Sequence, residues 1–279
     1  MQSGEGQIYG LIAPHAPTLL EDELDGRSGA VIQSLRALGH FFLEEEIDAV
    51  VAASTHWLAD EMLVDGSAQH RTIHDYYGFR VQLQYDAPGH PDLAAAIVEE
   101  ANRMLLFPSL KRHGVDHAVT IPMHFLFPEK AMPVIPISVG GCRVEAFRRG
   151  RAIAEAVRKS GLRVLFLASG SLSHDLQAFL NHDFDPEHER FDRHVLDLLE
   201  RGRGMEMDSI EPALINRSMP EGWFRDLYML LGAMGSRATA RVMAYERLPG
   251  VGLGVACFER SASTEEDDIT HSNYIEENL

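Results

Sequence analysis

Three histidines, each placed shortly after an apolar run, are the residues of this chain best suited to metal chemistry. His15, His56 and His174 come two, three and six residues after three runs that are expected to be strands. In open α/β sheets, ligands bind beyond the carboxyl ends of the strands. If the three strands run parallel, the three imidazoles converge on one crevice, where they can bind a metal ion or move protons.

A metal site of this kind needs a carboxylate as well. Two neutral imidazoles and one carboxylate form the facial triad of non-haem Fe(II) oxygenases, which leaves three positions open. His15 and His56 would supply the imidazoles. Glu246, at the end of a predicted strand, is the best-placed carboxylate, and its rivals Asp116 and Asp175 each adjoin a histidine needed for another role. Such a site stays net positive and suits an anionic chelator such as a catecholate.

Strands and helices that alternate along the chain must position these residues. Apolar runs predict strands at residues 8–13, 49–53, 133–139, 164–168, 238–245 and 251–258. Helical periodicity predicts helices at residues 28–43, 91–106, 144–160, 186–200 and 221–234. The alternation indicates a single α/β domain whose central sheet is mostly parallel or mixed and is flanked by helices.

The chain has 279 residues, of which 45% are hydrophobic, enough for a sizeable core. It shows neither an internal repeat nor a linker, so we predict one catalytic domain over residues 1–260. Residues 261–279 are acidic and hold few large apolar side chains. This composition predicts a mobile tail or an arm used in an oligomer.

The charge balance excludes some classes of partner. Acidic residues number 42 against 25 basic ones, which gives a net charge of -17. Such a surface repels phosphate backbones and anionic membranes, so neither nucleic acid nor a membrane is expected as a partner. No apolar run reaches the roughly 18 residues that a spanning helix needs.

The cysteine content and the first residues favour a cytoplasmic protein. Cys142 and Cys257 are the two cysteines of the sequence, too few for a disulfide framework or a four-thiolate zinc site. The first ten residues have neither the basic nor the apolar segment of a signal peptide. The sequence also lacks a Walker motif and a dinucleotide-binding glycine motif, so no nucleotide cofactor is expected.

Four short motifs resemble the class III extradiol ring-cleavage dioxygenases. They are PHAP around His15, STHW around His56, DHA around His117 and SGSLSHD around His174. This is the family of the protocatechuate 4,5-dioxygenase catalytic subunit and the class III homoprotocatechuate 2,3-dioxygenases. The resemblance extends from about residue 8 to residue 258. Within it, TIHDYYGF is similar to a segment of the related DOPA dioxygenases, and YERLPGVGLGVACF resembles the glutamate-bearing strand pair of the family.

The resemblance implies roles for five residues. His15 and His56 are similar to the two iron-binding histidines of the family, and Glu246 in YERL is similar to its iron-binding carboxylate. His117 and His174 are similar to the acid–base pair beside the substrate. Histidine, with an unperturbed pKa of about 6.5, can give or accept a proton near neutral pH. We assign His174 as the leading acid–base residue on the oxygen side and His117 as its partner, and leave open which acts first.

The function implied by the resemblance is that of an Fe(II)-dependent extradiol dioxygenase. Such an enzyme inserts both atoms of O2 into a catechol-type or 2-aminophenol-type ring and gives a ring-opened semialdehyde, in the catabolism of aromatic compounds. The substrate stays open among protocatechuate, homoprotocatechuate, a dihydroxyphenylpropanoid and 2-aminophenol. The resemblance also implies homo-oligomers or pairing with a small partner subunit.

Four further residues are candidates for supporting roles. His124 lies seven residues after His117, on the same face of a helix, and is either a substrate contact or a structural histidine. The same alternatives apply to His74 in TIHDYYGF. Asp116 and Asp175 each adjoin a proposed acid–base histidine, so each is expected either to orient it as a hydrogen-bond acceptor or to cap a loop.

Two other functions would use the same residues. Two histidines and a carboxylate also make a catalytic zinc site, so a zinc-dependent hydrolase is one alternative. The sequence has no HExxH motif, which weakens only the common zinc-protease arrangement. The other alternative is a non-catalytic binding protein on the same scaffold. A binding protein does not need an acid–base pair, so the presence of both His117 and His174 argues against it.

Overall fold

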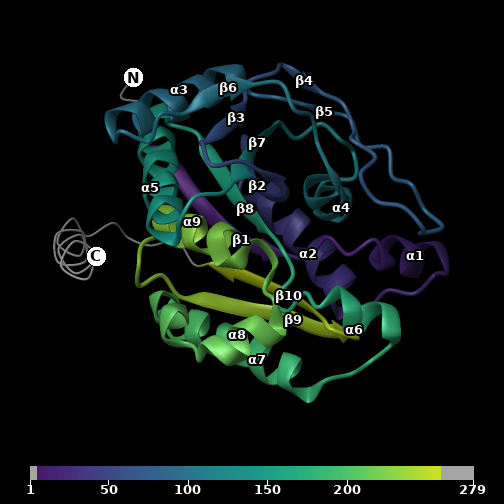
Figure 1. The fold of residues 1–279 in the computed structure, drawn as a ribbon. Coiled ribbons are helices and arrows are strands. Elements are labelled where there is room, and N and C mark those ends of the chain that lie inside the picture. Colours follow the sequence, from purple (N-terminus) through teal and green to yellow (C-terminus); the bar gives the residue numbers. More distant parts are fainter. Residues whose placement is uncertain (1–4, 259–279) are drawn as a thin grey trace.

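A mixed β-sheet forms the centre of the protein in a computed structural model that describes residues 5–258 (Figure 1). Its strands are β1 (Gln7–Ala13), β2 (Ala49–Leu58), β3 (Leu63–Asp65), β6 (Ser109–Lys111), β7 (Val134–Val139), β8 (Arg163–Ser169), β9 (Ala240–Leu248) and β10 (Val251–Phe258). They take the order β6-β3-β7-β2-β8-β1-β10-β9. A separate two-stranded sheet pairs β4 (Gln69–His70) with β5 (Ala87–Pro88).

Helices cover both faces of the large sheet. They are α1 (Thr18–Leu24), α2 (Ala30–Glu44), α3 (Pro91–Arg103), α4 (His117–Leu126), α5 (Arg143–Ser160), α6 (Leu176–Asn181), α7 (Pro186–Glu200), α8 (Pro212–Ser218) and α9 (Arg225–Met234), with short 3-10 turns η1 (Gly204–Ser209) and η2 (Glu221–Phe224). Helices α3, α5 and α9 pack over one face, and α2 and α4 over the other (Figure 1). The predicted α/β fold with a mixed sheet is confirmed.

The four central strands β7, β2, β8 and β1 run parallel and bring their carboxyl ends to one edge. The register places Ala13 of β1 and Ser54 of β2 on either side of Ser169 of β8. Helices cover both faces of these strands, so most of their side chains are buried, which explains why they are nearly continuous apolar runs in the sequence. The residues that follow Ala13, Ser54 and Ser169 therefore enter the same space.

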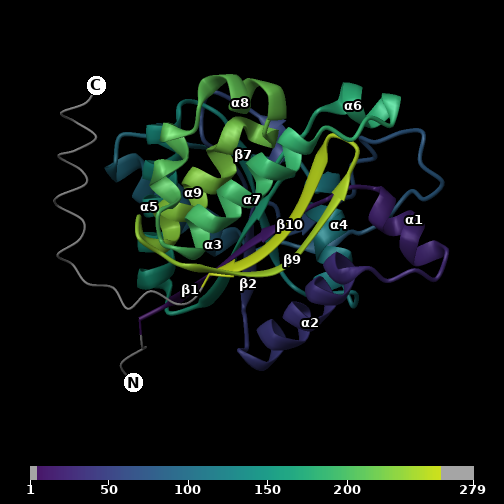
Figure 2. The same ribbon diagram turned by 90° about the horizontal axis from the view of Figure 1, so that it is seen from below.

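The hairpin of β9 and β10 closes the other side of the sheet, with β10 antiparallel to β1 (Figure 2). Its turn lies next to α6, where an added Cβ at Gly250 would come 2.3 Å from the carbonyl oxygen of Asp175. The hairpin turn therefore reaches the same edge as the carboxyl ends of β1 and β8. Strand β9 is separated from β1 by β10.

Helices α5 and α9 approach each other through a reciprocal pair of glycines. An added Cβ at Gly232 of α9 would lie 2.0 Å from the carbonyl oxygen of Phe147, and one at Gly150 of α5 would lie 1.9 Å from that of Met229. No side chain fits at either position while the backbones stay this close. Because α9 begins directly after η2, this contact also fixes the position of the η2 turn.

The structure departs from the predicted helix over residues 221–234. Helix α9 begins only at Arg225, and Gly222, Trp223 and Phe224 before it have φ values of 61°, 53° and 66°. A left-handed backbone cannot be part of a right-handed helix, so η2 is a separate turn.

Residues 259–260 of the predicted domain and the predicted tail, residues 261–279, lie outside the described residues. Within residues 5–258, every helix is too short or too polar to cross a membrane.

The α5–α9 contact predicts the effect of Gly232→Ala on stability. Helix propensity alone would favour alanine by about 1 kcal/mol. The overlap with Phe147 reverses that sign, and we expect the free energy of unfolding to fall by about 1–3 kcal/mol. Urea unfolding of both proteins measures this change. An unchanged or higher stability of Gly232→Ala would show that the two helices are free to move apart.

Candidate active site

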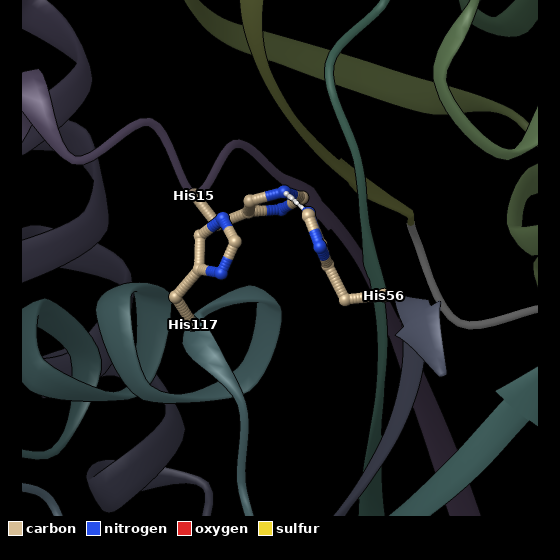
Figure 3. A group of neighbouring side chains, drawn as sticks. All are labelled: His15, His56 and His117. Atoms are coloured by element: carbon tan, nitrogen blue, oxygen red, sulfur yellow. Dashed lines mark hydrogen bonds between the residues drawn. The ribbon is translucent and has the colours of Figure 1, made fainter. Parts of the chain in front are cut away.

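The side chains of His15, His56 and His117 meet at the edge of the sheet where the parallel strands end (Figure 3). One ring nitrogen from each lies within 4.8 Å of the other two. His15 comes from the loop after β1, His56 from the end of β2, and His117 from the first turn of α4. His15 and His56 converge as predicted because β1 and β2 pair in register with β8. His117, in contrast, is carried by helix α4.

Local structure aims each of the first two rings at the site. The Nδ1 atom of His15 lies 3.0 Å from the hydroxyl of Ser169, which ends β8, and this contact leaves Nε2 facing the site. The pairing of β2 with β7 shifts register between Ser54 and Leu58, so His56 lies on a bulge. The backbone N–H of His56 donates to the Ser54 hydroxyl at 3.1 Å. Bulges commonly re-aim a side chain beside a functional site.

Glu221 supplies the carboxylate at the histidines. Its Oε1 atom lies 3.0 Å from Nε2 of His15 and 3.3 Å from Nε2 of His56. The hydroxyl of Thr55 donates to the same oxygen at 3.0 Å, and the backbone N–H of Ser171 donates to Oε2 at 2.7 Å. The carboxylate is thus buried and hydrogen-bonded through both oxygens.

The spacing of these three ligand atoms fits one metal ion. Ligands at about 2.1 Å from a metal and about 90° apart lie about 3.0 Å from one another. The three separations here are 3.0 Å, 3.3 Å and, between Nε2 of His15 and Nε2 of His56, 3.2 Å. Two imidazoles and one carboxylate on one side of an ion leave its other positions open. His15, His56 and Glu221 could therefore hold a metal as a facial triad.

Glu246, the carboxylate expected from the sequence, does not lie with the histidines. It belongs to the edge strand β9, and its Oε1 atom accepts a hydrogen bond from the backbone N–H of Ala30, at the start of α2, at 2.5 Å. Strand β10 lies between β9 and β1, so Glu246 on β9 is kept away from the crevice at the carboxyl end of β1. The structure therefore differs from the prediction that Glu246 lies beside His15 and His56. The run Pro220-Glu221-Gly222 was the missed signal, because proline and glycine mark a turn rather than a helix.

The η2 turn that delivers Glu221 is strained. Trp223 and Phe224 both occupy the left-handed region, with φ of 53° and 66°, where residues other than glycine are uncommon. The side chain of Arg225 holds the turn, donating from Nε to the carbonyl oxygen of Gly141 at 2.7 Å and from Nη1 to that of Gly222 at 3.3 Å. Backbone strain of this kind persists where the surrounding structure enforces it and is frequent at active sites.

The site electrostatics favour an ionised carboxylate beside a neutral imidazole. Burial alone would raise the pKa of Glu221, but the charge and hydrogen bond of His15 and the hydrogen bond of His56 hold it well below its usual value. Burial lowers the pKa of His15 in spite of the opposing effect of Glu221. Burial also opposes the charged form of His56, but hydrogen bonding and charge from Glu221 raise its pKa. Ionised carboxylate and neutral imidazole are the forms that bind metal.

The two histidines predicted as the acid–base pair lie beside this triad. The ring of His117 is centred 4.0 Å from that of His56 and 5.0 Å from that of His15. Its Nδ1 atom lies 2.8 Å from Oδ2 of Asp75, a residue that the sequence did not single out. His174 is close enough to Glu221 for its positive charge to lower the pKa of that carboxyl.

A buried carboxylate holds the loop that carries His174. Asp192 of α7 accepts hydrogen bonds from the backbone N–H and the hydroxyl of Ser173, at 2.7 Å and 3.0 Å, and from the hydroxyl of Tyr245 at 2.8 Å. Burial raises the pKa of Asp192 to about 6 in spite of these bonds. The His174 loop is thereby tied to both α7 and β9.

Asp116 and Asp175 have different partners. Asp116 accepts a hydrogen bond at 2.7 Å from the hydroxyl of Ser54, which supports the bulge of His56 rather than the ring of His117. Its charge also contributes to the raised pKa of His56. Asp175 accepts hydrogen bonds from two backbone N–H groups in the first turn of α6 and acts as its cap.

The two histidines proposed to contact substrate lie apart from the cluster. Nε2 of His124 is 2.6 Å from a carboxylate oxygen of Glu23 on α1. The side chain of His74 is exposed, and its Nε2 atom is 3.2 Å from the amide oxygen of Gln84. His124 does not share the site of His117 because it lies two helical turns further along, at the far end of α4, where it contacts Glu23 of α1.

The family of the chain follows from its match over nearly all the described residues. Residues 9–256 match the family model of the catalytic LigB subunit of aromatic ring-opening dioxygenases. The chain belongs to this family. The predictions of a class III extradiol family member and of a ring-cleaving dioxygenase are confirmed. In this LigB-family chain, the matched segment contains every residue of the cluster described above.

Named relatives of this LigB-family chain agree with the assignment. It is 28% identical over 249 residues to the 3,4-dihydroxyphenylacetate 2,3-dioxygenase of Escherichia coli, covering 79% of this chain and 87% of the relative. It is 27% identical over 207 residues to the 4,5-DOPA dioxygenase extradiol of Beta vulgaris, covering 70% and 76%. The fold matches the crystal structure of an uncharacterized Escherichia coli K12 protein with a TM-score of 0.70 at 20% identity, covering 90% of this chain and 99% of the other.

The buried Asp192 predicts a pH-dependent stability. Its pKa of about 6 in the folded protein exceeds the usual 3.8, so its contribution to stability is full below about pH 4 and is lost as the pH rises through 6. We expect the unfolding free energy of the wild type to fall by about 2 kcal/mol relative to Asp192→Asn between pH 4 and pH 7. Urea unfolding of both metal-free proteins tests this. An equal difference at both pH values would contradict a raised pKa.

The triad geometry predicts which glutamate matters for metal binding. Glu221→Ala would remove one of three candidate ligands for one ion and leave the imidazoles of His15 and His56 without their carboxylate, so Fe(II) affinity should fall by at least about 100-fold. The matched control Glu246→Ala should bind Fe(II) like the wild type, because its contact is with Ala30. Anaerobic Fe(II) titration followed by calorimetry measures both affinities. Loss of binding in Glu246→Ala with retention in Glu221→Ala would reverse the assignment.

Proposed function

We propose that this protein is a non-haem Fe(II)-dependent extradiol dioxygenase that opens a catechol-type ring beside its hydroxyl groups. The observation that carries the proposal is the mutual spacing of 3.0–3.3 Å among ligand atoms of His15, His56 and Glu221. Two more histidines, His117 and His174, border the triad. Membership of an aromatic ring-opening family supplies the reaction class.

The family membership weighs against both alternatives. A zinc hydrolase could use the same two imidazoles and one carboxylate, but its reaction is not the ring opening of this family. A binding protein without catalysis would have no use for the two further histidines. The strained turn at Glu221 also favours a working site, since a strained backbone that served no purpose would only destabilise the fold.

The position of each residue suggests which part of the reaction it would serve. Bound Fe(II) would bring the catechol oxygens and dioxygen to one centre and let electron density pass from ring to oxygen. His15, His56 and Glu221 would hold it from one side. His117 and His174 would hold and move the protons that a catechol hydroxyl loses and that the oxygen gains. Both lie on loops or helix ends fixed to the central sheet.

The substrate is proposed to be a substituted catechol or a 2-aminophenol. The two named relatives act, by their names, on 3,4-dihydroxyphenylacetate and DOPA. Protocatechuate, a dihydroxyphenylpropanoid and 2-aminophenol complete the set of candidates. A cytoplasmic location and assembly as a homo-oligomer or with a small partner subunit stay predictions.

Oxygen uptake tests the proposal directly. The purified protein is loaded with Fe(II) without oxygen and then exposed to air with each candidate catechol and 2-aminophenol. We expect one catechol to give oxygen consumption together with a yellow ring-opened product. In parallel, His174→Ala should bind iron like the wild type and lose turnover by about 100-fold or more, because its acid–base group is gone.

Two results would contradict the proposal. One is no oxygen uptake with any compound of the panel by the iron-loaded wild type. The other is hydrolytic activity with tightly bound zinc, which would favour the hydrolase. Full activity of His174→Ala would leave the ring cleavage standing and remove His174 from the acid–base pair.

A further inference from the structure

Asp75, in the loop between β4 and β5, holds His117 through both oxygens of one carboxylate. Oδ2 lies 2.8 Å from the ring Nδ1 of His117, and Oδ1 accepts a hydrogen bond from the backbone N–H of the same residue at 3.1 Å. Oδ2 also lies 3.7 Å from Nδ1 of His56. A carboxylate that contacts both the backbone and the ring of one residue fixes that ring relative to the helix that carries it.

This contact also selects the tautomer of the ring. An ionised carboxylate 2.8 Å away repels a ring-nitrogen lone pair, so the contact favours the tautomer with the hydrogen on Nδ1 of His117. The backbone hydrogen bond that Oδ1 of Asp75 accepts from His117 favours the ionised carboxylate. The neutral ring then has its lone pair on Nε2. The ring packs against those of His15 and His56, beside the triad (Figure 3).

We propose that Asp75 is a positioning residue that sets the orientation and tautomer of His117, so that Nε2 of His117 accepts the proton of a substrate hydroxyl. In that step the substrate O–H bond breaks, an Nε2–H bond forms, and the electron pair stays on the substrate oxygen. The charge of Asp75 stabilises the imidazolium that results. This inference rests on the proposed ring cleavage and gives His117 the role of base.

His174 differs from His117 in this respect. Within residues 5–258, the ring of His174 has no carboxylate at hydrogen-bonding distance. It interacts with Glu221 through charge at a longer distance. Among the described residues, no carboxylate therefore selects the tautomer of the His174 ring. With His117 as the base, His174 keeps its proposed role of delivering a proton on the oxygen side.

The loop of Asp75 is held by other contacts, which makes the role separable from folding. Asp86 accepts hydrogen bonds from the backbone N–H and the hydroxyl of Thr72 at 2.8 Å and 3.0 Å. The hydroxyl of Tyr76 accepts one from the backbone N–H of Leu83 at 2.9 Å. Asp86→Asn is therefore a matched control: the same substitution, in the same loop, at a carboxylate that contacts no histidine of the site.

Kinetics of Asp75→Asn provide the first test. The amide nitrogen of the new side chain can donate toward Nδ1 of His117, which favours the wrong tautomer. We expect kcat to fall by ~10²–10⁴-fold while KM and Fe(II) content stay near the wild-type values. Asp75→Glu, which keeps the accepting charge, should recover part of kcat, and Asp86→Asn should be near the wild type. Full kcat in Asp75→Asn, or an equal loss in Asp86→Asn, would overturn the inference.

Nitrogen NMR of the metal-free protein gives a readout that does not depend on turnover. With ¹⁵N-labelled histidine, and His117→Gln to assign the signals, wild-type His117 should show hydrogen on Nδ1, and Asp75→Asn should shift it to Nε2. An unchanged tautomer in Asp75→Asn would overturn the inference. If the iron-loaded wild type opened no ring, the proposed function would fail even though the tautomer result held, so the two failures are distinguishable.

Discussion

The buried carboxylate of Glu221, set between the Nε2 atoms of His15 and His56, is the interaction on which the rest of the structure depends. An uncompensated buried charge costs several kcal/mol, so both oxygens need partners. The two imidazoles, the hydroxyl of Thr55 and the backbone N–H of Ser171 supply them. These partners converge only because β1, β2 and β8 end at the same level, and the carboxylate reaches them only through a left-handed turn. Close packing of α9 on α5 then holds that turn in place.

The histidine rings of the site are also held by oxygen atoms that contact their Nδ1 atoms. Nδ1 of His15 contacts the hydroxyl of Ser169, and Nδ1 of His117 contacts Asp75, which also lies near His56. Partners of this kind fix the orientation of a ring before a metal or substrate arrives, and a carboxylate also favours one tautomer. The two ring contacts come from different segments, one from the end of a central strand and one from a long loop. The proposed metal ligand His15 is thus held by the central sheet, whereas the proposed base His117 is held by a loop.

The sequence predicted what depends on periodicity and on short contiguous motifs. Buried parallel strands are continuous apolar runs, so the strands that end before His15 and His174 were found with nearly their observed bounds. Glu221 could not be found in this way, because a turn without a repeating pattern carries it, and its role comes from packing between α5 and α9. Glu246 was misplaced because strand order is not visible in the sequence: β10 separates its strand from β1. Asp75 was missed because a contact between a loop and a helix end leaves no periodic signal.

A crystal structure of the Fe(II)-loaded protein, grown without oxygen and measured at the iron absorption edge, tests the central claim most directly. The account predicts one anomalous peak at about 2.0–2.2 Å from Nε2 of His15, Nε2 of His56 and a carboxylate oxygen of Glu221, with the remaining positions free of protein atoms. A peak bound by His15, His56 and His117 with Glu221 turned away would contradict it. So would a peak at Glu246, because either result would remove the buried carboxylate from the metal.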